Sequence, residues 1–92
     1  MTPRTLQERI AALLDVLTEA HGITRVEAAG IIADALGRSR RMVEKIGAGD
    51  YRHRNAALVD GFVWSLRPLE TKYREPLRLR REFIDACRQA AA

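Results

Sequence analysis

The stretch Ala33–Ala48, ADALGRSRRMVEKIGA, decides the fold of this 92-residue chain. Leu36 stands directly before Gly37, whose missing side chain permits the sharp backbone turn that separates two helices. Ser39 follows two residues later and can cap the next helix by accepting a hydrogen bond from a backbone N–H. The spacing therefore predicts two helices joined by a tight turn, with the second helix beginning at about Arg40.

The apolar residues of this stretch are placed to hold the two helices together. A small residue at Ala33 lets the first helix approach the second closely. Three larger apolar residues fill the wedge between the helices: Leu36, Val43 and Ile46. The second helix opens with Arg40 and Arg41, at the end that contacts base edges when such a helix enters the major groove. The pattern predicts a helix-turn-helix unit over residues 24–48.

At these residues the chain resembles the Cro/C1 repressor-like helix-turn-helix family. Leu36-Gly37-Arg38-Ser39 is similar to the family's Leu-Gly-Val-Ser turn, and Arg40–Ile46 is similar to its recognition helix. The resemblance covers mainly residues 24–55, and it implies binding to double-stranded DNA. The chain departs from the family at Arg38, which replaces an apolar residue. The run Thr24–Gly37 is also about one helical turn longer than the family norm.

Two other interpretations of the same residues are open. The apolar positions also suit the core of any small helical domain, and a helix-turn-helix scaffold can serve protein contacts instead of DNA. In the second case the chain is a small protein-binding module, such as a phage or plasmid-type inhibitor or adaptor. An exposed apolar strip would serve that role, and the sequence offers one: Trp64, Leu66, Leu69, Tyr73 and Leu77. We expect instead that this strip belongs to the core or to a dimer interface.

Length and composition predict one small all-α domain over residues 1–92. A chain of 92 residues buries only about 60–65% of its unfolded surface, so its core is small. The sequence is rich in Ala, Leu and Arg, poor in aromatic residues, and has few runs typical of strands. We expect a five-helix domain with the helix-turn-helix at its centre. The single cysteine, Cys87, excludes an intramolecular disulfide.

The net charge of +4 is unevenly distributed along the chain. Residues 1–37 carry a net charge of −2, residues 38–54 carry +4, and residues 55–92 carry +2. The densest positive charge, six Lys and Arg against two Asp and Glu, coincides with the candidate recognition helix. Such clustering is typical of a nucleic-acid-binding face, although a solvated basic surface without a partner would look the same.

Helical periodicity and capping residues predict the first two helices over residues 5–20 and 25–36. Each begins with a Thr that is followed three residues later by a Glu, which is the spacing of a capping box. The two capping residues are Thr5 and Thr24, and Gly22 ends the first helix.

The third helix is expected over residues 40–46, with the segment 47–50 ending it. A fourth helix is expected over residues 56–66, because Pro68 disfavours helical geometry at the residue before it. A polar connection then leads to a last helix over residues 76–89. The spacing assigns four side chains to the buried face of that helix: Leu79, Phe83, Ile84 and Cys87.

The candidate DNA-binding residues fall into two groups. We expect four side chains of the third helix to face the major groove: Arg40, Arg41, Glu44 and Lys45. Arginine is the commonest reader of guanine, through two parallel hydrogen bonds. Ser39 begins that helix and is expected to hydrogen-bond a phosphate. Four further side chains are expected to contact phosphates and so position the helix: Arg38, Arg52, His53 and Arg54. The alternative for the last three is an ordinary polar loop.

A homodimer is expected, joined through residues 56–90. One recognition helix reads only a few base pairs, whereas a two-fold dimer doubles the site and reads an inverted repeat. The helices of the C-terminal half carry apolar residues in excess of what the first three helices need. We expect three of these to cross the two-fold axis: Trp64, Leu69 and Phe83.

The sequence favours no catalytic or metal chemistry. Its two histidines, His21 and His53, lie apart, and no residues have the spacing of a metal site. We expect no enzyme activity, no cofactor and no metal. The N-terminus lacks a secretory apolar stretch and no run reaches membrane-spanning length, so we expect a cytoplasmic protein without membrane contact.

The expected function is that of a sequence-specific transcriptional regulator. A repressor is the simplest form, since the chain carries no separate sensor or activation domain and occupation of an operator suffices. An autoregulator in a mobile-element operon would be one example.

Overall fold

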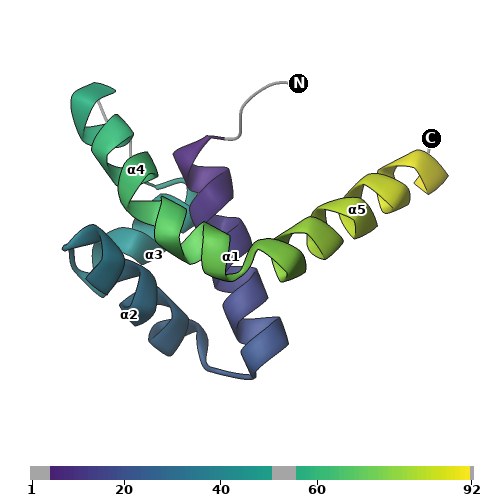
Figure 1. The fold of residues 1–92 in the computed structure, drawn as a ribbon, viewed down its shortest axis with the longest axis horizontal. Coiled ribbons are helices and arrows are strands. Elements are labelled where there is room, and N and C mark those ends of the chain that lie inside the picture. The colour runs from purple at the N-terminus through teal and green to yellow at the C-terminus, as the bar shows by residue number, and fades with distance from the viewer. Residues whose placement is uncertain (1–4, 51–55, 92) are drawn as a thin grey trace.

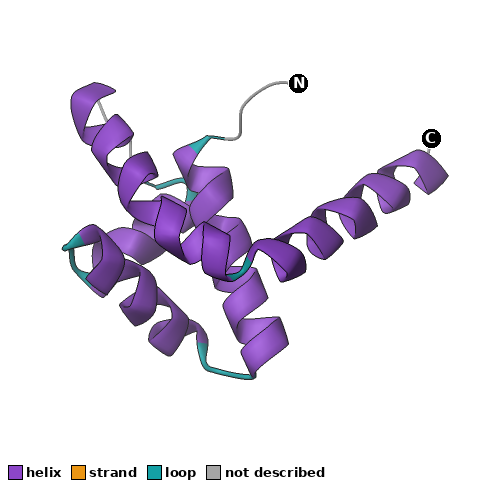
Figure 2. Ribbon diagram, in the orientation of Figure 1, coloured by secondary structure: helices purple, strands orange, loops and turns teal. Residues whose placement is uncertain are grey.

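The computed structural model describes residues 5–50 and 56–91, and these residues form five α-helices (Figure 1). The helices are α1 (Leu6–His21), α2 (Arg25–Leu36), α3 (Arg40–Ala48), α4 (Ala56–Lys72) and α5 (Arg74–Ala91). The described parts of the chain contain no strand, as Figure 2 shows. The prediction of a single all-α domain with five helices is confirmed.

Side-chain caps fix where the first three helices begin. The hydroxyl oxygens of Thr5, Thr24 and Ser39 each accept a hydrogen bond from the backbone N–H three residues ahead, at 3.2, 3.1 and 3.2 Å. Each cap satisfies one of the backbone donors that a helix leaves unpaired at its start. The predicted starts of α2 and α3 are therefore those observed, and α1 begins one residue after its predicted start.

The turn between α2 and α3 depends on Gly37. Its φ of 66° lies in the left-handed region, which residues with a side chain rarely adopt. Its backbone N–H donates to the carbonyl of Asp34 at 3.3 Å, and the N–H of Arg38 donates to that of Ala33 at 3.0 Å. These bonds close the end of α2 and reverse the chain into α3.

The predicted end of α3 was wrong by two residues, because Gly47 lies inside the helix rather than ending it. A Cβ on this buried glycine would lie 3.0 Å from Cδ1 of Leu14 and 3.5 Å from Cγ2 of Ile10. Gly47 therefore lets α1 and α3 approach closely. The helix ends at Gly49, whose φ is 83°.

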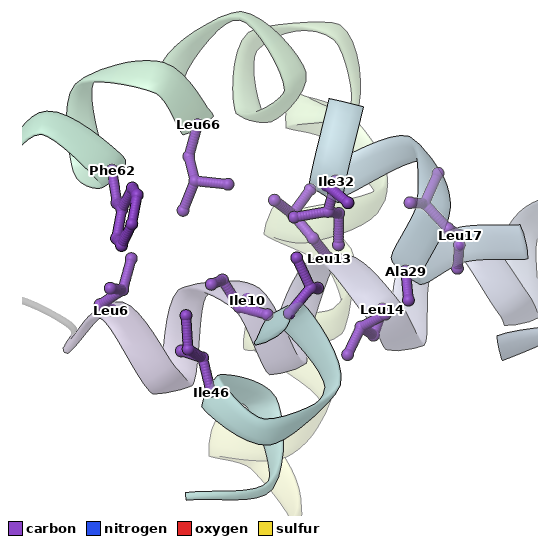
Figure 3. Close-up of a cluster of buried hydrophobic side chains, with 13 residues drawn as sticks. Leu6, Ile10, Leu13, Leu14, Leu17, Ala29, Ile32, Ile46, Phe62 and Leu66 are labelled. Atoms are coloured by element: carbon purple, nitrogen blue, oxygen red, sulfur yellow. The ribbon is translucent and has the colours of Figure 1, made fainter. Parts of the chain in front are cut away.

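The core lies where the first three helices meet and where α4 covers them (Figure 3). The predicted wedge residues Val43 and Ile46 are buried, Ala33 is buried, and Leu36 is partly buried. Ile10, Leu13, Leu14 and Leu17 enter the core from α1, with Ala28, Ala29 and Ile32 from α2 and Phe62 and Leu66 from α4. The helix-turn-helix is therefore packed as one unit with α1, and α4 closes one side of that unit.

The prediction that Arg67 and Pro68 end the fourth helix was wrong, since α4 continues to Lys72 with Pro68 inside it. A proline in a helix interior removes one backbone hydrogen bond and costs about 3 kcal/mol. The segment beyond it stays helical because Leu69 and Tyr73 pack against the core. In addition, Glu70 accepts a hydrogen bond from Nε of Arg9 on α1 at 3.0 Å. These tertiary contacts outweigh the local preference.

The last helix, α5, begins two residues before its predicted start and extends away from the other helices in Figure 1. None of its residues is buried. The prediction that Leu79, Phe83 and Cys87 lie on a buried face was therefore wrong. Leu79 and Phe83 are 53% and 69% exposed, Cys87 is exposed, and only Ile84 is partly buried. The physical reason is that α5 bears apolar residues on two sides, and only one side meets α1.

Candidate nucleic-acid interface

Helix α3 divides sharply into a buried side and a charged side. Val43 and Ile46 are 0% and 2% exposed and pack into the core formed with α1 and α2. Four charged side chains lie on the exposed surface of the same helix: Arg40, Arg41, Glu44 and Lys45. Since the buried residues fix the rotation of α3, the charged residues near its start are held toward solvent. All four residues predicted to read bases are thus placed on one accessible helix.

The start of α3 carries additional features suited to an anion. Ser39 Oγ accepts the hydrogen bond from the N–H of Met42, and its own hydroxyl hydrogen remains a donor. The first N–H groups of a helix carry partial positive charge, which favours a phosphate nearby. Ser39 therefore lies where the sequence placed it, at the junction between the turn and the charged side of α3.

Two shallow hollows border the start of α3 and show which side chains converge there. The first is lined by Val26, Ser39, Arg40, Arg41 and Glu44. The second is lined by Ser39, Arg41, Met42 and Lys45. The structure therefore brings the five candidate residues of 39–45 together on one surface.

Val26 belongs to this surface, and the sequence analysis did not find it. It stands in the first turn of α2, and 49% of it is exposed. An apolar side chain beside basic ones suits contact with the methyl group of thymine. The signal in the sequence was a β-branched residue directly after the capped start of α2, but only the packing of α2 against α3 places it beside Arg40.

The side chain of Arg40 follows a defined path across α2. A Cβ added at Gly30 would lie 3.3 Å from Cδ of Arg40 and 3.7 Å from its Cγ. The aliphatic stem of Arg40 therefore lies against the bare backbone of Gly30. Gly30 leaves room for this stem, although a glycine inside a helix costs about 1 kcal/mol relative to alanine.

The departure of the turn at Arg38 also has a structural reason. The guanidinium carbon of Arg38 lies 5.5 Å from the ring centroid of Phe62 on α4, which is the geometry of a cation–π contact. Phe62 is only 4% exposed, so Arg38 lies over an otherwise apolar ring. Arg38 connects the turn to α4 while remaining exposed. The three other predicted phosphate contacts, Arg52, His53 and Arg54, lie outside the described residues.

The residues predicted for the dimer interface do not share one environment. Trp64 is 68% exposed, and the guanidinium of Arg67 lies 4.9 Å from its ring centroid. Phe83 is 69% exposed on α5. Leu69 is partly buried and packs against the core of its own chain, which leaves less of it for a partner.

The apolar strip considered for a protein-binding module is mostly internal. Leu66 is fully buried, and three of its other members pack partly buried against the core: Leu69, Tyr73 and Leu77. Only Trp64 of that strip is largely exposed. The strip is therefore chiefly core, as favoured from the sequence.

The ionisable groups with perturbed pKa values belong to ion pairs, one between α1 and α4 and one within α5. A hydrogen bond from Arg9 to Glu70 raises the pKa of Arg9. A hydrogen bond from Arg78 lowers the pKa of the exposed Glu75 on the same helix. Among residues 5–50 and 56–91, His, Cys, Asp and Glu side chains nowhere gather in threes as a metal would need. In the same residues, no helix combines the length and apolar character needed to cross a membrane.

Comparison with known proteins adds no relative. No protein-family model matches the chain, and no curated protein or solved structure matches it. The arrangement of side chains around α3 is therefore the main evidence for a function.

Proposed function

We propose that this protein binds double-stranded DNA through α3 and regulates transcription, acting as a homodimeric repressor on an inverted-repeat operator. One observation supports the proposal most directly. Val43 and Ile46 anchor α3 in the core, while the charged side chains near its start converge on one exposed surface. The concentration of positive charge in residues 38–54 and the resemblance to Cro/C1-type repressors support it independently.

The proposed chemistry assigns a role to each side chain on this surface. Arg40 and Arg41 donate paired hydrogen bonds to the O6 and N7 atoms of guanine, and Glu44 accepts from the amino group of cytosine. Lys45 donates to guanine or to a phosphate at the edge of the groove. Ser39 donates to phosphate, and the positioning contacts come from Arg38, Arg52, His53 and Arg54.

Repression follows from occupancy alone, since a protein bound across a promoter blocks access to it. The dimer supplies the length of site that one small domain lacks. Two recognition helices related by a two-fold axis would read half-sites about 34–36 Å apart. A protein-binding module is the alternative that the experiment must separate from this function.

Gel shifts against the protein's own promoter region test the proposal. We expect a discrete complex whose affinity falls steeply with salt, because each phosphate contact releases counterions. The Arg40→Ala/Arg41→Ala double variant should lose this complex and retain the melting temperature of the wild type, since both side chains are exposed. Each single substitution should cost about 1–3 kcal/mol and relax the preference at one base pair.

Two results would refute the proposal. The first is full operator affinity in the double variant. The second is an affinity for the operator that is no higher than for DNA of random sequence and does not change with salt. That result would favour the protein-binding module.

A further inference from the structure

The side chain of Arg40 is held at its stem and unpaired at its charged end. Arg40 is exposed at the start of α3, and its aliphatic stem lies against Gly30 of α2. Arginine stems pack on neighbouring surfaces in this way while the charge stays in water. Among the described residues, the guanidinium forms no ion pair. Arg40 therefore has a path set by α2 and hydrogen-bond donors that remain available to a ligand.

The separation of Arg40 from Glu44 is informative, because the two residues are four apart on one helix. Opposite charges at that spacing are neighbours on a helix surface and stabilise it when they pair. On α5 the same arrangement does pair, since Arg78 donates to Glu82, four residues ahead, at 2.6 Å. All four of these residues are exposed. In α3 the stem of the arginine lies over α2 instead, and the guanidinium and the carboxylate stay apart.

Gly30 provides the space that this path needs. A Cβ at residue 30 would lie 3.3 Å from Cδ of Arg40 and 3.7 Å from its Cγ. Beyond α2 itself, no other described residue would come within 4 Å of that Cβ. Val26 stands one helical turn before Gly30 and lines the same hollow as Arg40. The stem therefore crosses α2 at a position where a side chain would displace Arg40 and little else.

We propose that Gly30 is a specificity-determining residue, which positions Arg40 for base recognition and keeps its guanidinium apart from Glu44. Gly30 acts through Arg40 rather than by contact with DNA. The inference rests on the proposed function, in which Arg40 and Glu44 each contact a base. A paired contact to guanine tolerates a displacement of only about 0.5 Å. A side chain at residue 30 would push Arg40 toward Glu44, and an ion pair within α3 would then occupy the groups that the bases need.

The contact with Gly30 also lowers the entropy cost of binding. An arginine that moves freely on a helix surface loses rotamer freedom when it binds a base, whereas a stem that is already packed loses less. The glycine has the opposite effect on folding, because it costs helix stability relative to alanine. A side chain at residue 30 should therefore stabilise α2 and weaken base recognition at the same time.

Selection of binding sites from a randomised DNA duplex library, with the full chain, tests this role. Sequencing of the selected duplexes gives the preference of each variant at each base pair. Arg40→Ala and Glu44→Ala identify the base pairs that these two side chains read, each through a loss of about tenfold in preference. Gly30→Leu should lose about as much at both base pairs. Gly30→Ala adds only the Cβ and should lose about threefold at the base pair of Arg40.

The double variant Gly30→Leu/Arg40→Ala distinguishes positioning from a general structural effect. Once Arg40 is removed, nothing occupies Glu44, so the preference at the base pair of Glu44 should return to that of the wild type. The salt dependence of binding should stay at the wild-type value in both Gly30 variants, because the phosphate contacts are unchanged. Circular dichroism melts should show that each variant keeps its fold.

Gly61→Leu is the matched control. Gly61 also lies exposed inside a helix, and a Cβ there would meet no described residue within 4 Å. This variant should keep the wild-type preference at every base pair. In the chain without DNA, NMR should show a nuclear Overhauser effect between the α protons of Gly30 and the δ-methylene of Arg40. That measurement checks the contact independently of any ligand.

A missing Overhauser effect would overturn the inference, as would a Gly30→Leu preference equal to that of the wild type. A loss at the base pair of Glu44 that persists without Arg40 would also overturn it, because Gly30 would then act by another route. A wild type that enriches no sequence would refute the proposed function, and with it this role. An enriched sequence whose selection is the same with any residue at position 30 would refute only the positioning by Gly30.

Discussion

Two glycines inside helices lie against neighbouring side chains that differ in their freedom to move. Gly30 on α2 faces the stem of Arg40, which is an exposed and flexible side chain. Gly47 on α3 faces Cδ1 of Leu14, which is 1% exposed and fixed in the core. The neighbour can move in the first case and is confined in the second, so the same substitution has different consequences at the two positions.

We therefore expect Gly30→Ala to raise the free energy of unfolding by up to about 1 kcal/mol through its better helix propensity. Gly47→Ala should lower it by about 1–3 kcal/mol, because its Cβ would overpack the core at 3.0 Å from Leu14. Urea denaturation followed by circular dichroism measures both. Equal changes at the two sites would show that helix propensity, rather than the neighbouring side chain, decides the outcome.

Val26 makes a prediction about base recognition under the proposed function. If its exposed side chain packs on a thymine methyl group, Val26→Ala should weaken operator binding by about 0.8 kcal/mol, or about fourfold. Replacing that thymine with deoxyuridine should weaken the wild type equally and leave the variant unaffected. The control is Ile31→Ala, since Ile31 is also exposed on α2 but does not line the hollows beside α3. A variant that still discriminates thymine from deoxyuridine at every position would exclude this contact.

At the scale of helices, the sequence predicted best where a cap and a glycine bracket an element. Thr24 and Gly37 mark the bounds of α2, and the observed helix has the predicted ends. Ser39 likewise marks the start of α3, and with Val43 and Ile46 buried it determines which side chains of that helix are exposed. The exposure of the candidate base-contacting residues was predictable for this reason.

The errors arose where contacts distant in sequence decide the structure. Arg9 and Glu70 are 61 residues apart, and their ion pair helps to hold α4 together beyond its proline. The apolar residues of α5 spread over more than one face, and periodicity alone does not say which face meets α1. Val26 joined the candidate site only because α2 packs beside α3. Each of these features depends on the relative placement of helices.

Pro68 tests the claim that tertiary contacts maintain α4. Pro68→Ala restores a backbone donor and removes a ring clash, so we expect the free energy of unfolding to rise by about 1–2 kcal/mol. This is less than the full cost of an interior proline, because alanine also leaves the unfolded chain more freedom. Thermal and urea unfolding would measure the change. A loss of stability would mean that α4 needs the bend at Pro68 to place Leu69 and Tyr73 on the core.

At the scale of the whole molecule, the orientation of α5 relative to α3 bears on the proposed dimer. If the two copies of the proposed dimer meet through α5, the angle between α5 and the body of the domain sets the distance between the two recognition helices. Polar contacts help to fix that angle, since α5 buries no residue fully and packs on the core through the partly buried Leu77. Arg80 is the main such contact, and its ion pairs with Asp15 and Glu19 are partly exposed. Partly exposed pairs contribute on the order of 0.2–1 kcal/mol each, which is enough to bias an orientation without deciding whether the chain folds.

We therefore expect Arg80→Ala to relax the spacing that a dimer accepts between half-sites while its affinity for a single half-site is unchanged. The wild type should bind best at one spacing and lose affinity when one base pair is inserted or removed, whereas Arg80→Ala should show a shallower dependence. Arg78→Ala is the matched control, because among the described residues Arg78 pairs with Glu75 and Glu82 on α5 itself and should leave the spacing preference intact. Gel shifts on a series of operators differing only in spacer length give both profiles. Identical profiles for the two variants would mean that Arg80 does not set the orientation, and that packing of Leu77 and Ile84 on α1 holds α5 in place.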